Sequence, residues 1–213
     1  MDLITLTDPR SPVSEAYRTL RTNLSFYSLD NPIKTLVVTS AAVDEGKSAT
    51  IANLAVTMAQ GGHRTILVDC DLRRPSLHTL FNLQAEPGFT NMILEEGSDP
   101  PLQQTSVENL SLLAAGTLPP NPADLLGSKK VDQLITRLSA MADIILFDAP
   151  PVIAVTDAAV LGGKVDGVLL TISAGKTKRD HAERAKDTLE KAKVRIVGVT
   201  LTNAPRDSVI GGY

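Results

Sequence analysis

The sequence of 213 residues contains one cysteine, three histidines, three tyrosines and no tryptophan. One cysteine cannot form a disulfide within the chain, and the first residues, MDLITLTD, have neither the basic nor the apolar region of a secretory signal. His63, His78 and His181 do not have a spacing that is typical of a metal site. These absences favour a cytoplasmic protein without disulfides or a histidine-bound metal.

Long apolar runs and an excess of charge of one sign are also missing. The longest apolar runs, such as residues 144–147, are far shorter than the ~20 residues that a membrane-spanning helix requires. Any role at a membrane would therefore depend on a partner. The chain has 21 Lys and Arg against 24 Asp and Glu, a net charge of −3. This balance gives no reason to predict binding to nucleic acid.

The apolar residues that are present gather in short runs with almost no alternation. Such runs predict strands buried on both faces, as in a parallel sheet covered by helices, and helical patterns lie between them. We therefore predict one α/β domain, residues 1–213, with a doubly wound, mostly parallel sheet and helices on both faces. The predicted strands are 35–39, 65–68, 110–114, 143–147, 167–172 and 195–201, and the predicted helices are 47–60, 129–141 and 177–191.

Residues 1–30 are predicted to contain a separate amino-terminal helix. We expect Ser14 to cap this helix, which has an apolar stripe and a charged flank. Taken alone, the charged flank is typical of a solvated surface. The stripe consists of Val13, Tyr17, Leu20 and Leu24, and the flank consists of Glu15, Arg18 and Arg21.

Two segments are predicted to be poor in regular structure. Residues 84–108 contain Pro-Gly, Glu-Glu-Gly and Pro-Pro, so we expect one short helix and loops there. Residues 204–213 are expected to form a flexible tail that ends in a single tyrosine, Tyr213.

Residues 40–50, SAAVDEGKSAT, are similar to a phosphate-binding loop. The consensus G-x-x-x-x-G-K-[ST] keeps Gly46, Lys47 and Ser48 but begins with Ala41. The string follows a predicted buried strand and starts a predicted helix, where backbone N–H groups and the positive helix end attract an anion. The Lys47 ammonium can reach the β- and γ-phosphates of ATP, and the Ser48 hydroxyl can bind Mg²⁺.

Missing glycines change this loop. Val43 and Asp44 stand where the backbone often needs a positive φ, a conformation that Asp tolerates better than most residues. Ala49 follows Ser48 and has no hydroxyl group to offer to a phosphate. The residues predicted to bind ATP are Val43, Asp44, Glu45, Gly46, Lys47, Ser48 and Ala49.

Carboxylates follow two of the predicted strands. Asp69 and Asp71 come after one strand and Asp148 ends another, and the carboxyl ends of parallel strands meet at one edge of the sheet. We expect Ser48, Asp71 and Asp148 to hold Mg²⁺. Asp69 and Asp71 can supply a base that takes the proton of a phenol acceptor, whose pKa is about 10. The alternative is that these residues only form solvated turns.

Together these residues resemble the bacterial protein-tyrosine kinases that control capsule and exopolysaccharide synthesis. The resemblance covers about residues 11–203. It is carried by residues 40–48 as Walker A, VDCDLR at 68–73 as the extra acidic Walker A′, LFDAPP at 146–151 as Walker B, Glu15-x-x-Arg18-x-x-Arg21 as a subunit-contact motif, and GTLPPNPADLL at 116–126 as a family signature.

The resemblance implies an ATP-dependent kinase that phosphorylates itself in trans within a ring-like homo-oligomer, with 1–30 as the oligomerisation helix. It also implies other protein tyrosine substrates and a transmembrane activator of the polysaccharide co-polymerase type, which would recruit the chain to the inner face of the membrane. The implied catalytic residues are Lys47, Asp69, Asp71 and Arg73, and Asn203 matches a position that contacts adenine.

The tyrosines depart from the family pattern, which usually has a cluster in the tail. This sequence has only Tyr17, Tyr27 and Tyr213. Either a cluster lies beyond a truncation after Tyr213, or the protein acts on other substrates. Among the tyrosines present, Tyr213 is the predicted phosphate acceptor, because a Gly-Gly tail can bend into a neighbouring site.

Two other functions remain open. A partition or septum-positioning ATPase of the same P-loop class typically has a second lysine early in the phosphate loop, and the absence of lysine around Ala42 favours the kinase. A nucleotide-gated regulator of polysaccharide export with little catalysis is favoured by the missing glycines and the sparse tyrosines.

Overall fold

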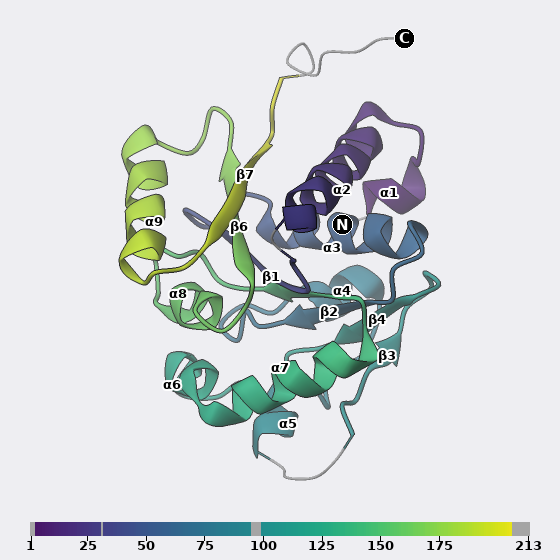
Figure 1. The fold of residues 1–213 in the computed structure, drawn as a ribbon, viewed down its shortest axis with the longest axis vertical. Coiled ribbons are helices and arrows are strands. Elements are labelled where there is room, and N and C mark those ends of the chain that lie inside the picture. The colour runs from purple at the N-terminus through teal and green to yellow at the C-terminus, as the bar shows by residue number, and fades with distance from the viewer. Residues whose placement is uncertain (1–2, 31, 95–98, 206–213) are drawn as a thin grey trace.

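The structure is a computed structural model, and it describes residues 3–30, 32–94 and 99–205. Within these ranges seven strands form one sheet in the order β3-β4-β2-β5-β1-β6-β7, and only the β3–β4 pair is antiparallel (Figure 1). The strands are β1 (Thr35–Ser40), β2 (Thr65–Asp69), β3 (Gln103–Gln104), β4 (Leu110–Leu113), β5 (Ile144–Asp148), β6 (Gly167–Ser173) and β7 (Ile196–Thr202).

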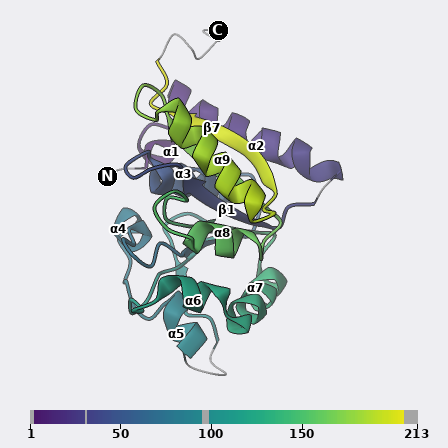
Figure 2. The ribbon, with the colours of Figure 1, turned by 90° about the vertical axis from the view of Figure 1, so that its left-hand side faces the viewer.

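Helices cover both faces of the sheet (Figures 1 and 2). Because side chains alternate along a strand, Val37 and Phe147 pack under one layer of helices, whereas Leu36, Val38 and Leu146 pack under the other. The first layer contains α5 (Phe89–Leu94), α6 (Pro122–Gly127), α7 (Lys129–Met141), α8 (Asp157–Gly162) and α9 (Arg179–Lys191). The second contains α1 (Ile4–Thr7), α2 (Pro12–Asp30), α3 (Lys47–Gln60) and α4 (Leu77–Phe81).

The predicted fold class is therefore confirmed. All six predicted strands are present with ends that differ by at most one residue, and the predicted helices 47–60 and 129–141 match α3 and α7. The third predicted helix begins two residues later than expected, at Arg179. Helix α5 lies in the segment 84–108, where one short helix was expected, but β3 in that segment was not predicted, and neither were α1, α4, α6 and α8.

The amino-terminal helix differs from the prediction at its start. The Ser11 hydroxyl oxygen accepts a hydrogen bond from the Ser14 N–H (3.2 Å), so Ser11 caps α2. Ser14 is fully buried in the first turn, and its hydroxyl donates to the Asp8 carbonyl oxygen (2.7 Å). The prediction that Ser14 is the cap is wrong for this reason. Val13 is 53% exposed and does not belong to the buried stripe, whereas Leu24 does.

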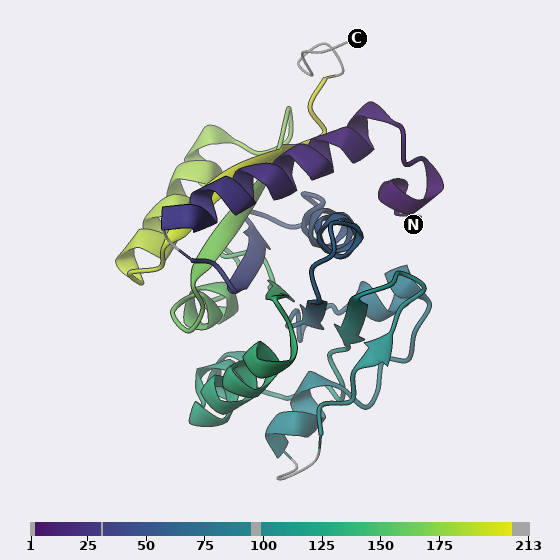
Figure 3. The same cartoon turned by 45° about the vertical axis from the view of Figure 1, so that its right-hand side comes forward.

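Helix α2 lies against α3 (Figure 3). The Arg21 guanidinium donates to the Thr57 carbonyl oxygen of α3 at 2.7 Å. Arg21 therefore helps to hold α2 on the domain, in addition to any role at a subunit interface. None of the helices in the described ranges combines the length and the hydropathy needed to cross a bilayer.

Candidate functional site

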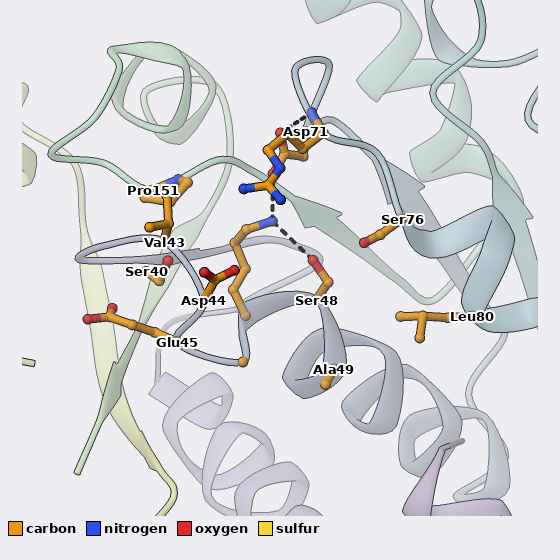
Figure 4. A pocket seen from close by; sticks show the side chains of 13 residues that line it. Ser40, Val43, Asp44, Glu45, Ser48, Ala49, Asp71, Ser76, Leu80 and Pro151 are labelled. Atoms are coloured by element: carbon orange, nitrogen blue, oxygen red, sulfur yellow. Dashed lines mark hydrogen bonds and ion pairs between the residues drawn. The ribbon is translucent and has the colours of Figure 1, made fainter. Parts of the chain in front are cut away.

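Three neighbouring strands bring the predicted site residues to one edge of the sheet. Strand β5 lies between β2 and β1, and Asp69 at the end of β2 pairs in register with Asp148 at the end of β5. The end of β1 continues into the phosphate-binding loop and then into α3. A cavity of about 520 Å³ opens above these strand ends (Figure 4). It is lined by Ser40, residues 43–49, Asp71, Arg74, Ser76, Leu80 and Pro151.

Lys47 lies at the centre of this site. Its ammonium donates to Asp71 Oδ2 (2.9 Å) and to Asp148 Oδ1 (2.8 Å), and all three side chains are buried. The Ser48 hydroxyl donates to Asp148 Oδ2 at 2.6 Å. Burial by itself lowers the pKa of Lys47, but the charges of Asp148 and Asp71 and their hydrogen bonds outweigh it, so the pKa of Lys47 is raised above its ordinary value. Lys47 is therefore a cation held among oxygen atoms.

The same oxygen atoms suit a magnesium ion. Ser48, Asp71 and Asp148 provide one hydroxyl and two carboxylates, the hard donors that Mg²⁺ prefers when it also binds phosphate oxygens and water. A positive charge already occupies the space between the two carboxylates in the form of Lys47. The residues predicted to hold Mg²⁺ are thus brought together, and their chemistry fits the ion.

Asp69 lies beneath the cavity and does not line it. It is fully buried, and its Oδ2 accepts hydrogen bonds from the N–H groups of Ser76 (3.0 Å) and Leu77 (2.9 Å). Its Oδ1 accepts a third hydrogen bond from the Asp71 N–H (3.2 Å). Burial, together with the negative charge of Asp148, raises the pKa of Asp69 to about 7. These contacts give Asp69 the geometry of a residue that fixes the loop between β2 and α4.

The two arginines of that loop have different positions. Arg73 forms a two-pronged ion pair with the buried Asp157 of α8, with Nε–Oδ2 at 2.9 Å and Nη2–Oδ1 at 3.0 Å, and it does not line the cavity. Arg74 does line it, and the Arg74 N–H donates to Asp71 Oδ1 at 3.0 Å. The structure therefore brings Arg74, and not the predicted Arg73, to the cavity.

The phosphate-binding loop lacks some of the usual glycines, and the Glu45 carboxylate holds its backbone in place. Glu45 is buried; its Oε2 accepts the Ala42 N–H (2.9 Å), and its Oε1 accepts the Thr177 hydroxyl. Figure 4 shows Glu45 pointing away from Ser48 and Asp71. Asp44 has a φ of 56°, so the expected left-handed backbone at this position is confirmed. Gly46, which precedes α3, also has a positive φ of 80°, a conformation that favours glycine.

Several predicted residues lie elsewhere. Asn203 follows β7, is exposed and donates from Nδ2 to the Ala174 carbonyl oxygen (3.2 Å), outside the cavity lining. Its contact with adenine stays a prediction. Glu15, Arg18 and Arg21 of α2 are not among the residues that line the cavity. Tyr213 lies outside the described residues.

The sequence-based reasoning missed five cavity residues. Ser40, Arg74 and Pro151 lie within or directly beside the recognised motifs, so the motifs themselves could have indicated them. Ser76 and Leu80 had no such signal, because α4 was not predicted.

Comparisons with known proteins agree with this geometry. Residues 32–203 match the family model ParA, described as a NUBPL iron-transfer P-loop NTPase. The chain is 43% identical over 201 residues to the tyrosine-protein kinase YwqD of Bacillus subtilis, covering 94% of this chain and 85% of that protein. It is 38% identical over 200 residues to the putative tyrosine-protein kinase CapB of Staphylococcus aureus, covering 93% and 88%. The crystal structure of the chimerical protein CapA2B2 superposes with a TM-score of 0.91 at 33% identity, over 96% of this chain and 90% of that one.

Proposed function

The chain belongs to the bacterial protein-tyrosine kinases of capsule and exopolysaccharide synthesis, within the P-loop NTPases, and we propose that it transfers the γ-phosphoryl group of ATP to tyrosine side chains of proteins. The observation that carries this proposal is the position of Lys47. Its ammonium lies between Asp71 and Asp148 at a cavity lined by the phosphate-binding loop.

Binding of ATP requires Lys47 to change partners. Backbone N–H groups of the loop and the first turn of α3 attract the phosphates, and Lys47 can turn from the two carboxylates toward the β- and γ-phosphates. Mg²⁺, when bound by Ser48, Asp71 and Asp148, would neutralise the charge of the phosphate oxygens. The site then holds the phosphates by charge and position, which is most of what phosphoryl transfer requires.

The carboxylate that accepts the phenol proton is Asp71, because it lines the cavity. Asp69 has its oxygen atoms occupied by three backbone N–H groups and acts as a positioning residue for the loop that carries Asp71. The predicted roles of Lys47, Ser48 and Asp148 are retained. For Arg73 the ion pair with Asp157 supports a structural role.

Tyr213 is the proposed site of self-phosphorylation in trans. Of the two other tyrosines, Tyr17 is partly buried on α2, and burial raises its pKa. Tyr27 is 39% exposed, but the Arg195 guanidinium lies 5.0 Å from the centre of its ring. Both side chains are therefore held by contacts on the domain, which makes them poor candidates for an acceptor that enters a neighbouring site.

The partners remain those that the resemblance implies: a ring-like homo-oligomer formed through α2, and a transmembrane activator that recruits the chain to the inner face of the membrane. Exposed apolar side chains on α2 support a contact surface there, namely Val13, Phe26 and Leu29.

The two alternatives have less support. The curated relatives reported above are named tyrosine kinases, which disfavours a partition or septum-positioning ATPase. A regulator without catalysis is disfavoured because the lysine, the hydroxyl and both carboxylates needed for transfer are assembled around one point.

Incubation with γ-labelled ATP and a tyrosine copolymer tests the proposal. Wild type should label the copolymer and, in a phosphopeptide map, its own Tyr213. Lys47→Met should abolish labelling because it removes the charge that holds the phosphates. Lys186→Met, at an exposed ion pair of α9, is the matched control and should keep full activity. Phosphate release without labelling by wild type would instead support the ATPase, and neither reaction would support the regulator.

A further inference from the structure

The cavity has two walls, and the nucleotide motifs explain only one. The first wall is the phosphate-binding loop, residues 43–49. The second wall comes from the segment that joins β2 to α4 and from α4 itself, and it contributes Arg74, Ser76 and Leu80. Figure 4 shows Ser76 and Leu80 on the opposite side of the cavity from Ser40, Val43 and Glu45.

Arg74 brings an unneutralised positive charge to the second wall. Its guanidinium has no hydrogen-bond acceptor or counter-ion among residues 3–30, 32–94 and 99–205, whereas the adjacent Arg73 is paired with Asp157. The backbone of Arg74 is fixed, because its N–H donates to both the carbonyl oxygen (3.2 Å) and Oδ1 (3.0 Å) of Asp71. The Arg74 side chain therefore extends from a backbone position that is bonded to Asp71, the carboxylate that holds Lys47.

Leu80 adds an apolar surface that phosphate groups do not need. It is partly buried on α4, packs against the core cluster that contains Leu77 and lines the cavity. Helix α4 is anchored, since the N–H of Leu77, its first residue, donates to the buried carboxylate of Asp69. A cation and an apolar side chain on one wall are the two groups that would recognise a phosphotyrosine: one binds the phosphate and the other contacts the ring.

The adenosine part of ATP can lie on the side of the cavity that is formed by the phosphate-binding loop, opposite the second wall. Thr202 at the end of β7 donates from its hydroxyl to the Glu45 carbonyl oxygen (2.8 Å), so the end of β7 and the following Asn203 lie next to the first wall. A nucleotide with its base toward that side leaves the second wall beyond the γ-phosphate, where an acceptor in line with the leaving group must lie.

We propose that Arg74 and Leu80 form the subsite for the acceptor tyrosine, an inference that rests on the kinase function proposed above. Leu80 contacts the phenol ring, and Arg74 binds oxygen atoms of the phosphoryl group as it reaches the acceptor. In the transfer, the phenol oxygen forms a bond to the γ-phosphorus, and the bond from that phosphorus to the bridging oxygen breaks. The electron pair of the broken bond leaves with ADP, and the phenol proton goes to Asp71.

Steady-state kinetics with the tyrosine copolymer and calorimetry with MgADP test this subsite. Arg74→Gln should lower kcat/KM for the copolymer by about 100-fold, the usual cost of losing one such donor to a reacting group, and Arg74→Lys should recover part of it. Leu80→Ala should raise KM for the copolymer. MgADP affinity should stay near the wild-type value in all three. Arg179→Gln and Leu6→Ala, at exposed sites, are the matched controls.

Free phosphotyrosine provides a second readout that does not depend on turnover. Calorimetry should detect its binding to the MgADP complex of wild type more strongly than that of phosphoserine, and Arg74→Gln should abolish it. Thermal unfolding of each variant shows whether it is folded. Unchanged copolymer kinetics in folded Arg74 and Leu80 variants would overturn the subsite, as would a loss of MgADP affinity in Arg74→Gln, which would assign the guanidinium to the nucleotide. A wild type that labels no tyrosine would overturn the kinase function itself.

Discussion

At the scale of single residues, the site separates two aspartates that the sequence presents as a pair. Asp71 and Asp69 are two positions apart, yet one lines the cavity and the other is buried under the loop that begins α4. Successive residues of an extended chain point to opposite faces, so two residues that are two positions apart would share a face. Asp69 and Asp71 take different positions because the chain turns after β2 ends at Asp69. Here the turn is held by Asp69.

This division of roles predicts different outcomes for two substitutions. Asp71→Asn should lower the rate of transfer by about 100-fold or more, the range typical of a lost general base, with a much smaller effect on ATP affinity and on thermal stability. Asp69→Ala leaves three N–H groups without their acceptor, and the bonds from Asp71 and Leu77 are buried. Each buried group left without an acceptor costs about 1–3 kcal/mol. The substitution should lower the free energy of unfolding by roughly 3 kcal/mol or more.

Urea denaturation and single-turnover kinetics measure the two effects. Asp69→Asn is the matched control, because it keeps an oxygen that can accept from Ser76 and Leu77. Equal losses of stability in Asp69→Ala and Asp71→Asn would contradict the assignment.

At the scale of elements, the phosphate-binding loop depends on the loop between β6 and α9. Thr177 donates to Glu45, and its own hydroxyl oxygen accepts the Ser173 N–H (2.7 Å). Thr177→Val should leave the buried Glu45 carboxylate short of a donor, lower the free energy of unfolding by about 1–3 kcal/mol and raise KM for ATP. Thr188→Val is the control, because the Thr188 hydroxyl donates to the Arg184 carbonyl oxygen within α9. An unchanged KM for ATP would show that the loop holds its shape without this contact.

A second link joins the start of β2 to the start of β5, through Arg64 and Asp143. Hydrogen bonds from the Arg64 side chain and backbone lower the pKa of Asp143 to about 2, from an ordinary value of 3.8. A lowered pKa stabilises the fold only while the carboxylate is charged. The contribution is therefore fully present above about pH 4 and is lost as the pH falls through about 2.

Asp143→Asn should accordingly be less stable than wild type at pH 6, and the difference should shrink between pH 4 and pH 2. Denaturation by urea at a series of pH values measures it, with Asp187→Asn on the exposed face of α9 as control. A difference that stays constant down to pH 2 would show that the charge of Asp143 makes no contribution.

The elements also show what the sequence could and could not predict. The strands were predictable because buried parallel strands are continuous apolar runs, and α3 and α7 have enough turns for a periodic pattern. Helices α4, α6 and α8 have five or six residues, too few for periodicity. Leu80 was missed with α4. Arg73 was assigned to the site because a motif gives the order of residues but not the direction of their side chains, and the buried partner Asp157 is 84 residues away.

At the scale of the whole molecule, α2 is the surface on which assembly is expected. Glu15 and Arg18 form an exposed ion pair on α2 (2.8 Å), and charged groups of this kind can exchange partners with a second subunit. Glu15→Ala with Arg18→Ala should shift the protein toward monomers in light scattering. Arg21 should be changed separately, because its bond to Thr57 also holds α2 on α3.

The control for this experiment removes a comparable exposed pair, Arg179 and Glu183 of α9. Its mass in solution should equal that of wild type. An equal mass for the α2 variant and wild type would remove the interface role of Glu15 and Arg18.

The strand order has a consequence for how the chain is made. Strand β1 lies between β5 and β6, so its two neighbours are more than 100 residues later in the sequence, and β2 does not pair with it. While the ribosome synthesises the intervening residues, both edges of TLVVTS remain without a native partner. Nascent chains that stop before residue 173 therefore carry an apolar strand open to pairing with other chains, and this interval of translation is when the protein depends most on chaperones.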